Sequence, residues 1–261
     1  MKRSQSIIGA ISAALLVMLT GCGSDSATTA SSTSTPAGGT LTVYAAASLK
    51  QTFTDIGEQF KTDNPGWKVD FTFAGSSDLV TQLTQGAKGD VFASADTKNM
   101  DKAAKAGLLA GDPVTFASNT LAIVVAPGNP KQVTSFADLN KPGLTVVVCA
   151  PQVPCGSATE KVEQSTKVTL NPVSEESSVT DVLNKVTTGQ ADAGLVYVTD
   201  ALGAGDKVAK VDFPEAAAAV NTYPIGVLKT AADAAAAHEF VDLVTGEAGQ
   251  KILSQAGFAK P

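Results

Sequence analysis

Residues 41–49, Leu41-Thr42-Val43-Tyr44-Ala45-Ala46-Ala47-Ser48-Leu49, decide the fold class because they pass directly from a strand into a helix. Residues 41–46 are apolar or β-branched and predict a buried strand. Ser48 then begins a stretch whose apolar residues recur at helical spacing, namely Leu49, Phe53, Ile56 and Phe60. A strand that leads directly into an amphipathic helix is the repeating unit of α/β proteins.

The same alternation continues to the end of the chain, without an internal repeat of fixed period. Further strands are expected at residues 68–74, 90–94, 121–126, 145–149 and 193–198. Helices are expected from Ser76, at 97–106, 135–139, 157–165 and 179–187, from Asp200, and at 232–254. The predicted fold class is therefore α/β.

Length and charge limit the possible functions. The chain has 261 residues, which is enough for one large domain or for two lobes with a core each. Its 19 Lys and Arg residues against 25 Asp and Glu residues give a net charge of −6. This balance argues against nucleic acid as a partner, because such proteins present a basic surface.

The N-terminus predicts a processed, lipid-anchored protein. Lys2 and Arg3 precede an apolar run, residues 7–19, which is too short to span a membrane and typical of a secretory signal. Leu19-Thr20-Gly21-Cys22 resembles a bacterial lipobox, so residues 1–22 are expected to be a signal peptide with Cys22 as the lipidated residue. The alternative is a plain secretory signal with an incidental cysteine. Residues 23–39, rich in Ser, Thr, Ala and Gly, predict a flexible tether to the extracytoplasmic face of the cell membrane.

The two remaining cysteines, Cys149 and Cys155, lie in the part of the chain expected outside the cytoplasm, where disulfides persist. Their spacing permits a small closed loop, and two unpaired thiols are the alternative. A metal site is not expected, because His238 is the only histidine and no CxxC pair occurs.

Hydroxyl-bearing corners precede several of the predicted helices. Each such corner places unpaired backbone N–H groups and a partial positive charge at one point, which suits an anion. The alternative at each corner is a serine that only caps its helix. The corners are Ala47-Ser48, Gly75-Ser76-Ser77, Cys155-Gly156-Ser157 and Ser177-Ser178-Val179.

At these corners the chain resembles the periplasmic molybdate-binding proteins of ABC importers. The resemblance runs from residue 41 to the C-terminus in consistent order. It lies in residues 41–49, in Phe73-Ala74-Gly75-Ser76-Ser77-Asp78-Leu79, in Gly89-Asp90-Val91-Phe92-Ala93-Ser94-Ala95-Asp96, in Asn119-Thr120-Leu121, in Gly194-Leu195-Val196-Tyr197 with Asp200-Ala201, in Tyr223-Pro224-Ile225, and in Gly246-Glu247-Ala248-Gly249 with Gly257-Phe258.

The resemblance implies the two-lobed fold of class II solute-binding proteins, with the ligand in the cleft between the lobes. Residues 40–118 and 222–261 would form lobe one and residues 119–221 lobe two, with crossover segments at the strand from Leu121 and at 221–224. The implied partners are an ABC permease and its ATPase, and a monomer is expected.

The resemblance also implies a ligand and its contacts. Molybdate or tungstate would be bound as an oxyanion, with no cofactor and no free metal cation. The expected ligand-binding residues are Ser48, Ser76, Cys155, Val179 and Tyr197. Cys155 and Val179 would donate through the backbone, and relatives often have alanine where this chain has Cys155.

The chemistry of these positions fits an unprotonated dianion, which requires only hydrogen-bond donors. Hydrogen phosphate would need a carboxylate acceptor, and none of the five positions is acidic. The same fold binding sulfate or another oxyanion is the alternative function. An enzyme is not expected, because the chain has no GxSxG elbow and its single histidine, His238, lies beside Glu239 in an Ala-rich helix.

Overall fold

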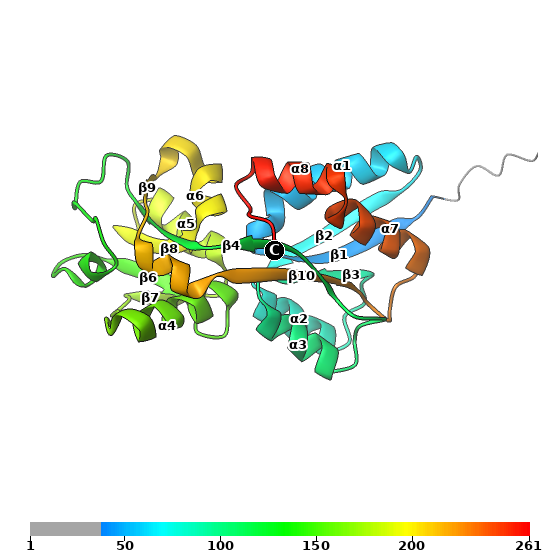
Figure 1. Ribbon diagram of the computed structural model, residues 1–261, viewed down its shortest axis with the longest axis horizontal. Coiled ribbons are helices and arrows are strands. Elements are labelled where there is room, and N and C mark those ends of the chain that lie inside the picture. The colour runs from blue at the N-terminus through cyan, green and yellow to red at the C-terminus, as the bar shows by residue number, and fades with distance from the viewer. Residues whose placement is uncertain (1–37) are drawn as a thin grey trace, which may run out of the picture. The chain divides into compact units, whose positions relative to one another are not determined.

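The computed structural model describes residues 38–261, so the expectations for the signal peptide, Cys22 and residues 23–37 of the tether lie outside the described residues. The first of its two sheets has the strand order β2-β1-β3-β10-β4 (Figure 1). Strand β1 pairs in parallel with β2 and β3, whereas β10 runs antiparallel to β3 and β4. These strands are β1 (Thr40–Ala46), β2 (Lys68–Ala74), β3 (Val91–Ala93), β4 (Val114–Asn119) and β10 (Asn221–Val227).

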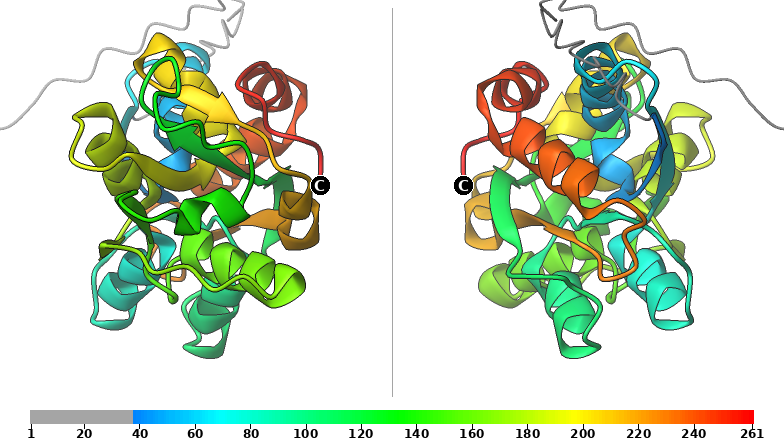
Figure 2. Two further views of the ribbon diagram at one scale, coloured as in Figure 1. Left: turned by 90° about the vertical axis from the view of Figure 1, so that its left-hand side faces the viewer. Right: turned by 90° about the vertical axis from the view of Figure 1, so that its right-hand side faces the viewer.

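Helices cover both faces of this sheet, and together they form lobe one (Figures 1 and 2). One face carries α1 (Lys50–Asp63), α7 (Ala234–Thr245) and α8 (Glu247–Gln255), and the other carries α2 (Ser76–Thr84) and α3 (Thr97–Lys105). The first face buries an aromatic cluster in which Phe53 packs against Phe71, Phe116 and Phe240. Each buried phenylalanine contributes about 1.5–3 kcal/mol.

The second sheet, with the order β7-β6-β8-β5-β9, is the centre of lobe two. Its inner strands are wholly apolar except at their ends, as expected for strands covered on both faces. The strands are β5 (Leu121–Val125), β6 (Val146–Cys149), β7 (Ser174–Glu176), β8 (Ala193–Tyr197) and β9 (Ala209–Val211). The covering helices are α4 (Pro154–Thr166), α5 (Val179–Thr187) and α6 (Val198–Ala204).

Two neighbouring segments connect the sheets. The chain leaves the first sheet at the end of β4 and starts β5 two residues later, and it returns at the start of β10. Asn119 and Asn221 are paired residues of the antiparallel β4–β10 ladder, so both connections lie side by side. The same α/β pattern in the sequence therefore forms two lobes and not one continuous sheet.

Several element boundaries differ from the expectations. The helix predicted from Ser48 is a 3-10 turn, η1 (Ala47–Leu49), followed by α1 from Lys50. Helix α4 starts at Pro154 and not at residue 157, because proline is well suited to the first helical turn. The predicted helix at 232–254 is two helices, because the backbone of Gly246 is extended and interrupts it. A side chain at Gly246 would lie 2.8 Å from the Asp242 carbonyl oxygen, so this break favours glycine.

Strand β10 was expected only as a crossover segment and not as a strand, and several short elements also escaped prediction. They are β4, β7, β9 and the 3-10 segments η3 (Gly205–Lys207) and η4 (Pro214–Ala219), while the helix predicted at 135–139 is the 3-10 segment η2 (Ala137–Asn140). Among residues 38–261, no helix combines the length and apolar character needed to cross a bilayer.

Candidate functional site

The five residues singled out in the sequence meet at one small cavity. Its lining comprises Ala46, Ala47, Ser48, Gly75, Ser76, Ala95, Val153, Pro154, Cys155, Val179 and Tyr197. Ser48 and Ser76 belong to lobe one, and Cys155, Val179 and Tyr197 belong to lobe two. The cavity therefore lies between the lobes. Only about 10 Å³ is open to the centre of a water molecule, which is room for roughly one water. A large organic solute could therefore enter only if the lobes separated.

Ser76 is the first residue of α2 and is completely buried. Its Oγ lies 3.0 Å from the backbone nitrogen of Ala95, and a backbone N–H can only donate. Ser76 therefore accepts from Ala95, and its own proton is available to the cavity. Because Gly75 is the N-cap and Ser76 makes no capping bond, the alternative of a merely capping serine fails at this corner.

Ser48 lies in the middle of the 3-10 turn η1, between β1 and α1. Its Oγ is 3.1 Å from the hydroxyl oxygen of Tyr223, and either group can donate. When Tyr223 donates, the Ser48 proton is free for the cavity. Ser48 also lines a wider cleft between the lobes, which includes Lys50 and Asp200.

The corner that starts α4 presents backbone and not side chains. Pro154, Cys155 and Gly156 form the first turn of this helix. Pro154 has no N–H, and the backbone N–H groups of Cys155 and Gly156 have no partner inside the helix. The predicted disulfide between Cys149 and Cys155 is present and joins the end of β6 to this turn. A side chain at Gly156 would lie 2.0 Å from the Ala150 carbonyl oxygen, so only glycine permits this tight return.

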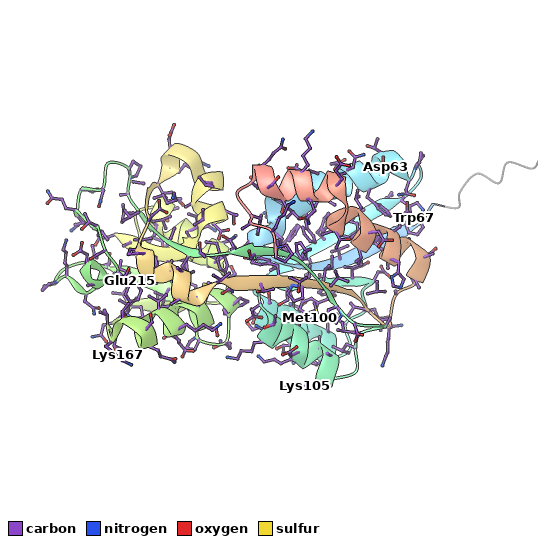
Figure 3. All side chains as sticks on the ribbon, viewed as in Figure 1. Asp63, Trp67, Met100, Lys105, Lys167 and Glu215 are labelled. Atoms are coloured by element: carbon purple, nitrogen blue, oxygen red, sulfur yellow. A yellow bond between two sulfur atoms is a disulfide. The ribbon has the colours of Figure 1, made fainter. Side chains whose placement is uncertain are left out.

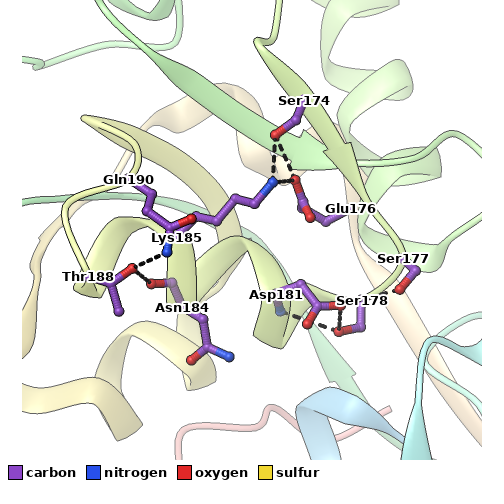
Figure 4. A network of polar contacts seen from close by, with 9 residues as sticks. All are labelled: Ser174, Glu176, Ser177, Ser178, Asp181, Asn184, Lys185, Thr188 and Gln190. Carbon is purple, nitrogen blue, oxygen red and sulfur yellow. Dashed lines mark hydrogen bonds and ion pairs between the residues drawn. The ribbon is translucent and has the colours of Figure 1, made fainter.

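Val179 begins α5 and is buried. Like the α4 corner, it presents the backbone of a first helical turn to the cavity. Here the capping alternative holds for the preceding residue, since Ser178 Oγ accepts from the Asp181 backbone N–H at 3.3 Å. Farther along, Lys185 forms an ion pair with Glu176 and donates to Ser174 Oγ at 3.0 Å (Figure 4). These contacts hold α5 against β7 and thereby fix where its N-terminus lies.

Tyr197 ends β8 and is 1% exposed. Burial raises the pKa of its hydroxyl well above the ordinary value, so the group remains a donor. The hydroxyl oxygen accepts from Asn221 Nδ2 at 2.7 Å, and the Tyr197 backbone N–H donates to Asp200 at 3.0 Å. No local sequence pattern indicates a role for Asn221, because its partners Ala95 and Tyr197 lie far away in the chain.

The electrostatics of the cavity come from neutral groups. No Lys, Arg, His, Asp or Glu occurs among its lining residues. Two carboxyl groups lie behind the lining. Asp96 is buried, whereas Asp200 is half-buried and also lines the wider cleft. Removal from water raises the pKa of Asp96, and it raises the pKa of Asp200 to about 7. The first turns of α2, α4 and α5 contribute partial positive charge, which favours an anion.

The single tryptophan, Trp67, has no part in the cavity. It precedes β2, at the end of that strand opposite to Gly75, and packs edge-on against Phe60 with ring centroids 6.2 Å apart (Figure 3). Among the described residues, no cluster of three or more His, Cys, Asp or Glu side chains could hold a metal ion.

Two α/β lobes that enclose a donor-lined cavity define a solute-binding protein of the two-lobed periplasmic type. The chain belongs to the bacterial extracellular solute-binding protein family, whose model matches residues 41–259. It is 61% identical to the molybdate-binding protein ModA of Mycobacterium bovis over 97% of each chain.

Solved structures of the same fold bind different oxyanions. The periplasmic molybdate-binding protein of Azotobacter vinelandii has a TM-score of 0.71 at 24% identity, covering 85% of this chain and 99% of its own. The sulfate-binding protein SubI of Mycobacterium tuberculosis has a TM-score of 0.75 at 20% identity, covering 85% and 86% of the two chains. At these identities the likeness establishes the fold and not the ligand.

Proposed function

We propose that this protein captures molybdate or tungstate outside the cytoplasm and delivers it to an ABC importer. The ligand-binding residues would be Ser48, Ser76, Cys155, Val179 and Tyr197, and the ligand would bridge lobe one (40–118 and 222–261) and lobe two (119–221). The observation that carries this proposal is a cavity lined from both lobes by neutral hydrogen-bond donors and by no charged side chain. An unprotonated dianion needs donors only, and the sequence relative named for molybdate binding supports the choice of anion.

The donors are sufficient for physiological affinity. Each hydrogen bond to a charged partner contributes about 1.5–3 kcal/mol, and each helix terminus adds about 0.3–2 kcal/mol. Several such contacts leave about 8–10 kcal/mol after the costs of association, which corresponds to micromolar or submicromolar binding. An acidic protein can therefore bind an anion without lysine or arginine in the site.

Sulfate is the competing ligand. It is also an unprotonated tetrahedral dianion, and a sulfate-binding protein shares the fold. The two ligands differ in size, because the Mo–O bond is longer than the S–O bond. Calorimetric titration of the purified protein with molybdate, tungstate, sulfate and hydrogen phosphate tests the proposal: we expect molybdate and tungstate to bind most tightly, and tighter binding of sulfate would assign the protein to sulfate.

The proposal contains no catalytic step and no cofactor. His238, the only histidine of the chain, is exposed on α7 in lobe one, and the cavity lining offers no general base. The partners are the permease and ATPase of the importer, and the binding protein itself acts as a monomer.

The proposed location is the extracytoplasmic face of the cell membrane, with the lipid on Cys22 and residues 23–39 as tether. The lipobox-like residues 19–22 support this location. Replacement of Cys22 by alanine is expected to release the protein or stall its processing. Unmodified Cys22 in mass spectra of membrane-extracted wild-type protein would contradict the anchor.

A further inference from the structure

Asn221, the first residue of β10, connects both lobes at the cavity. Its side chain is 4% exposed, and its Nδ2 lies 2.7 Å from the Tyr197 hydroxyl oxygen and 2.8 Å from the Ala95 carbonyl oxygen. A longer contact of 3.3 Å reaches the carbonyl oxygen of Pro154. Ala95 lies in lobe one, whereas Tyr197 and Pro154 lie in lobe two. The amide thus occupies the centre of an interlobe hydrogen-bond network.

The neighbours of this amide determine which way it points. The Ala95 and Pro154 carbonyl oxygens only accept, so the nitrogen of Asn221 and not its oxygen must face them. This nitrogen carries two protons and cannot accept a hydrogen bond. In the contact with Asn221, Tyr197 is therefore the acceptor.

The Tyr197 proton is consequently free for another acceptor. The neighbouring Tyr223 hydroxyl is one acceptor within reach, and an anion in the cavity that Tyr197 lines is the other. Ala95 has a matching role in lobe one, because its N–H donates to Ser76 and so leaves the Ser76 proton for the cavity. Ala95 is thus linked to the hydroxyls of both Ser76 and Tyr197. Its N–H donates to Ser76, and its carbonyl oxygen accepts from Asn221, which also donates to Tyr197. One hydroxyl from each lobe is fixed as a donor.

We propose that Asn221 is a positioning residue that determines specificity: its amide commits the Tyr197 hydroxyl to donate, so that the site selects oxyanions without a proton. The inference rests on the proposed function. A protonated oxyanion such as hydrogen phosphate brings a donor of its own, which needs an acceptor in the site. Where Tyr197 can only donate, the proton of the oxyanion finds no acceptor, and its affinity is lower by about tenfold or more.

Selectivity between two anions of equal charge tests this role. Molybdate and hydrogen phosphate are both dianions at pH 8, so general changes in charge or closure affect them alike. In Asn221→Ala the Tyr197 hydroxyl is free to turn toward the Ala95 or Pro154 carbonyl oxygen and present a lone pair to the ligand. We expect calorimetry to show the preference for molybdate over hydrogen phosphate falling by about tenfold. Asn221→Leu, which preserves volume, should show the same fall if the alanine variant is unstable.

Two further variants separate this role from a structural one. Asn99→Ala is the matched control, because Asn99 is also buried and also reaches across the lobes, to the Gln152 carbonyl oxygen at 3.3 Å, without contacting a cavity hydroxyl. It should leave the preference unchanged. In a Tyr197→Phe background, Asn221→Ala should alter molybdate affinity by less than about twofold, since coupled positions are non-additive.

The outcomes distinguish the two proposals. An unchanged preference in Asn221→Ala and Asn221→Leu, or an equal loss of molybdate affinity in both Tyr197 backgrounds, would overturn the role of Asn221 and leave the proposed function standing. A wild-type protein that binds none of the tetrahedral oxyanions would overturn both.

Discussion

Gly75 of lobe one and Ser177 of lobe two approach so closely that a side chain at Gly75 has no room. A Cβ atom placed on Gly75 would lie 2.1 Å from the Ser177 carbonyl oxygen and 3.5 Å from a methyl group of Val153. The backbone of Gly75 has an ordinary φ of −58°, which any residue adopts. The requirement for glycine therefore comes from the neighbouring lobe and not from the local backbone.

This relationship predicts a variant that impairs closure alone. Gly75→Ala should fold normally, because its conformation suits alanine, but the lobes must remain apart by the width of a methyl group. Since only the closed arrangement brings both sets of donors to the ligand, we expect molybdate affinity to fall by at least about tenfold. Calorimetry measures the affinity, and small-angle scattering should show less compaction with ligand than in the wild type.

Gly111→Ala is the matched control for this variant, because a Cβ there would meet nothing within 4 Å. It should bind like the wild type. Wild-type affinity in Gly75→Ala would show that binding does not need the approach of Gly75 to Ser177.

The two serines should each account for one charge-assisted hydrogen bond. Ser48→Ala and Ser76→Ala are expected to lose about 1.5–3 kcal/mol of binding, or roughly tenfold to a hundredfold in affinity. Lys50→Ala, an exposed charge next to the site, should change affinity by less than about threefold, because exposed charges are screened. Titration with molybdate measures the affinity of each of the three variants. Wild-type affinity in both serine variants would place the anion elsewhere.

Sequence patterns located residues that line the cavity but not the network behind them. The alternation of strands and helices revealed the corners of Ser48 and Ser76, because each follows a strand and begins a helix within a few residues. The corner of Val179 was indicated by the two serines before its predicted helix, since the preceding strand β7 was not predicted. Asn221, in contrast, depends on contacts with Ala95 and Tyr197 that only the assembled lobes create. Short edge strands such as β7 and β9 have too few residues to show an alternating pattern.

The disulfide should rigidify the α4 corner. Closing a short loop constrains the unfolded chain by about 2–3 kcal/mol in the entropic account, and Cys149–Cys155 also holds the first turn of α4 against β6. The Cys149→Ser, Cys155→Ser double variant is therefore expected to melt at a lower temperature and to bind molybdate several-fold more weakly. Differential alkylation before and after reduction checks the bond itself: two extra alkylations after reduction are expected, and free Cys149 and Cys155 before reduction would contradict it.

The raised pKa of Asp200 leads us to expect that molybdate binding depends on pH. Its pKa is raised to about 7 by burial, so the carboxyl is largely neutral at pH 6 and charged at pH 8. A negative charge beside Tyr197 opposes a dianion, and we expect roughly threefold to tenfold tighter molybdate binding at pH 6 than at pH 8. Calorimetry at both values measures this change, with Asp200→Asn as the control that should remove it.

The same group affects stability without ligand. A raised pKa means that the folded state holds the proton more firmly than the unfolded state, so the free energy of unfolding should decrease as the pH rises from about 4 to about 7. Asp200→Asn should flatten the profile in this range. A wild-type profile that rises throughout the range and is unchanged by the substitution would show that Asp200 titrates normally.

The position of the molybdenum atom in the bound protein is the sharpest test of the proposed site. Anomalous X-ray scattering at the molybdenum absorption edge, from crystals of the purified protein with molybdate, locates that atom without reference to any assumed contact. We expect one strong peak between the lobes, bounded by Ser48, Ser76, Cys155, Val179 and Tyr197. A peak at any other position, or no peak at saturating molybdate, would contradict it.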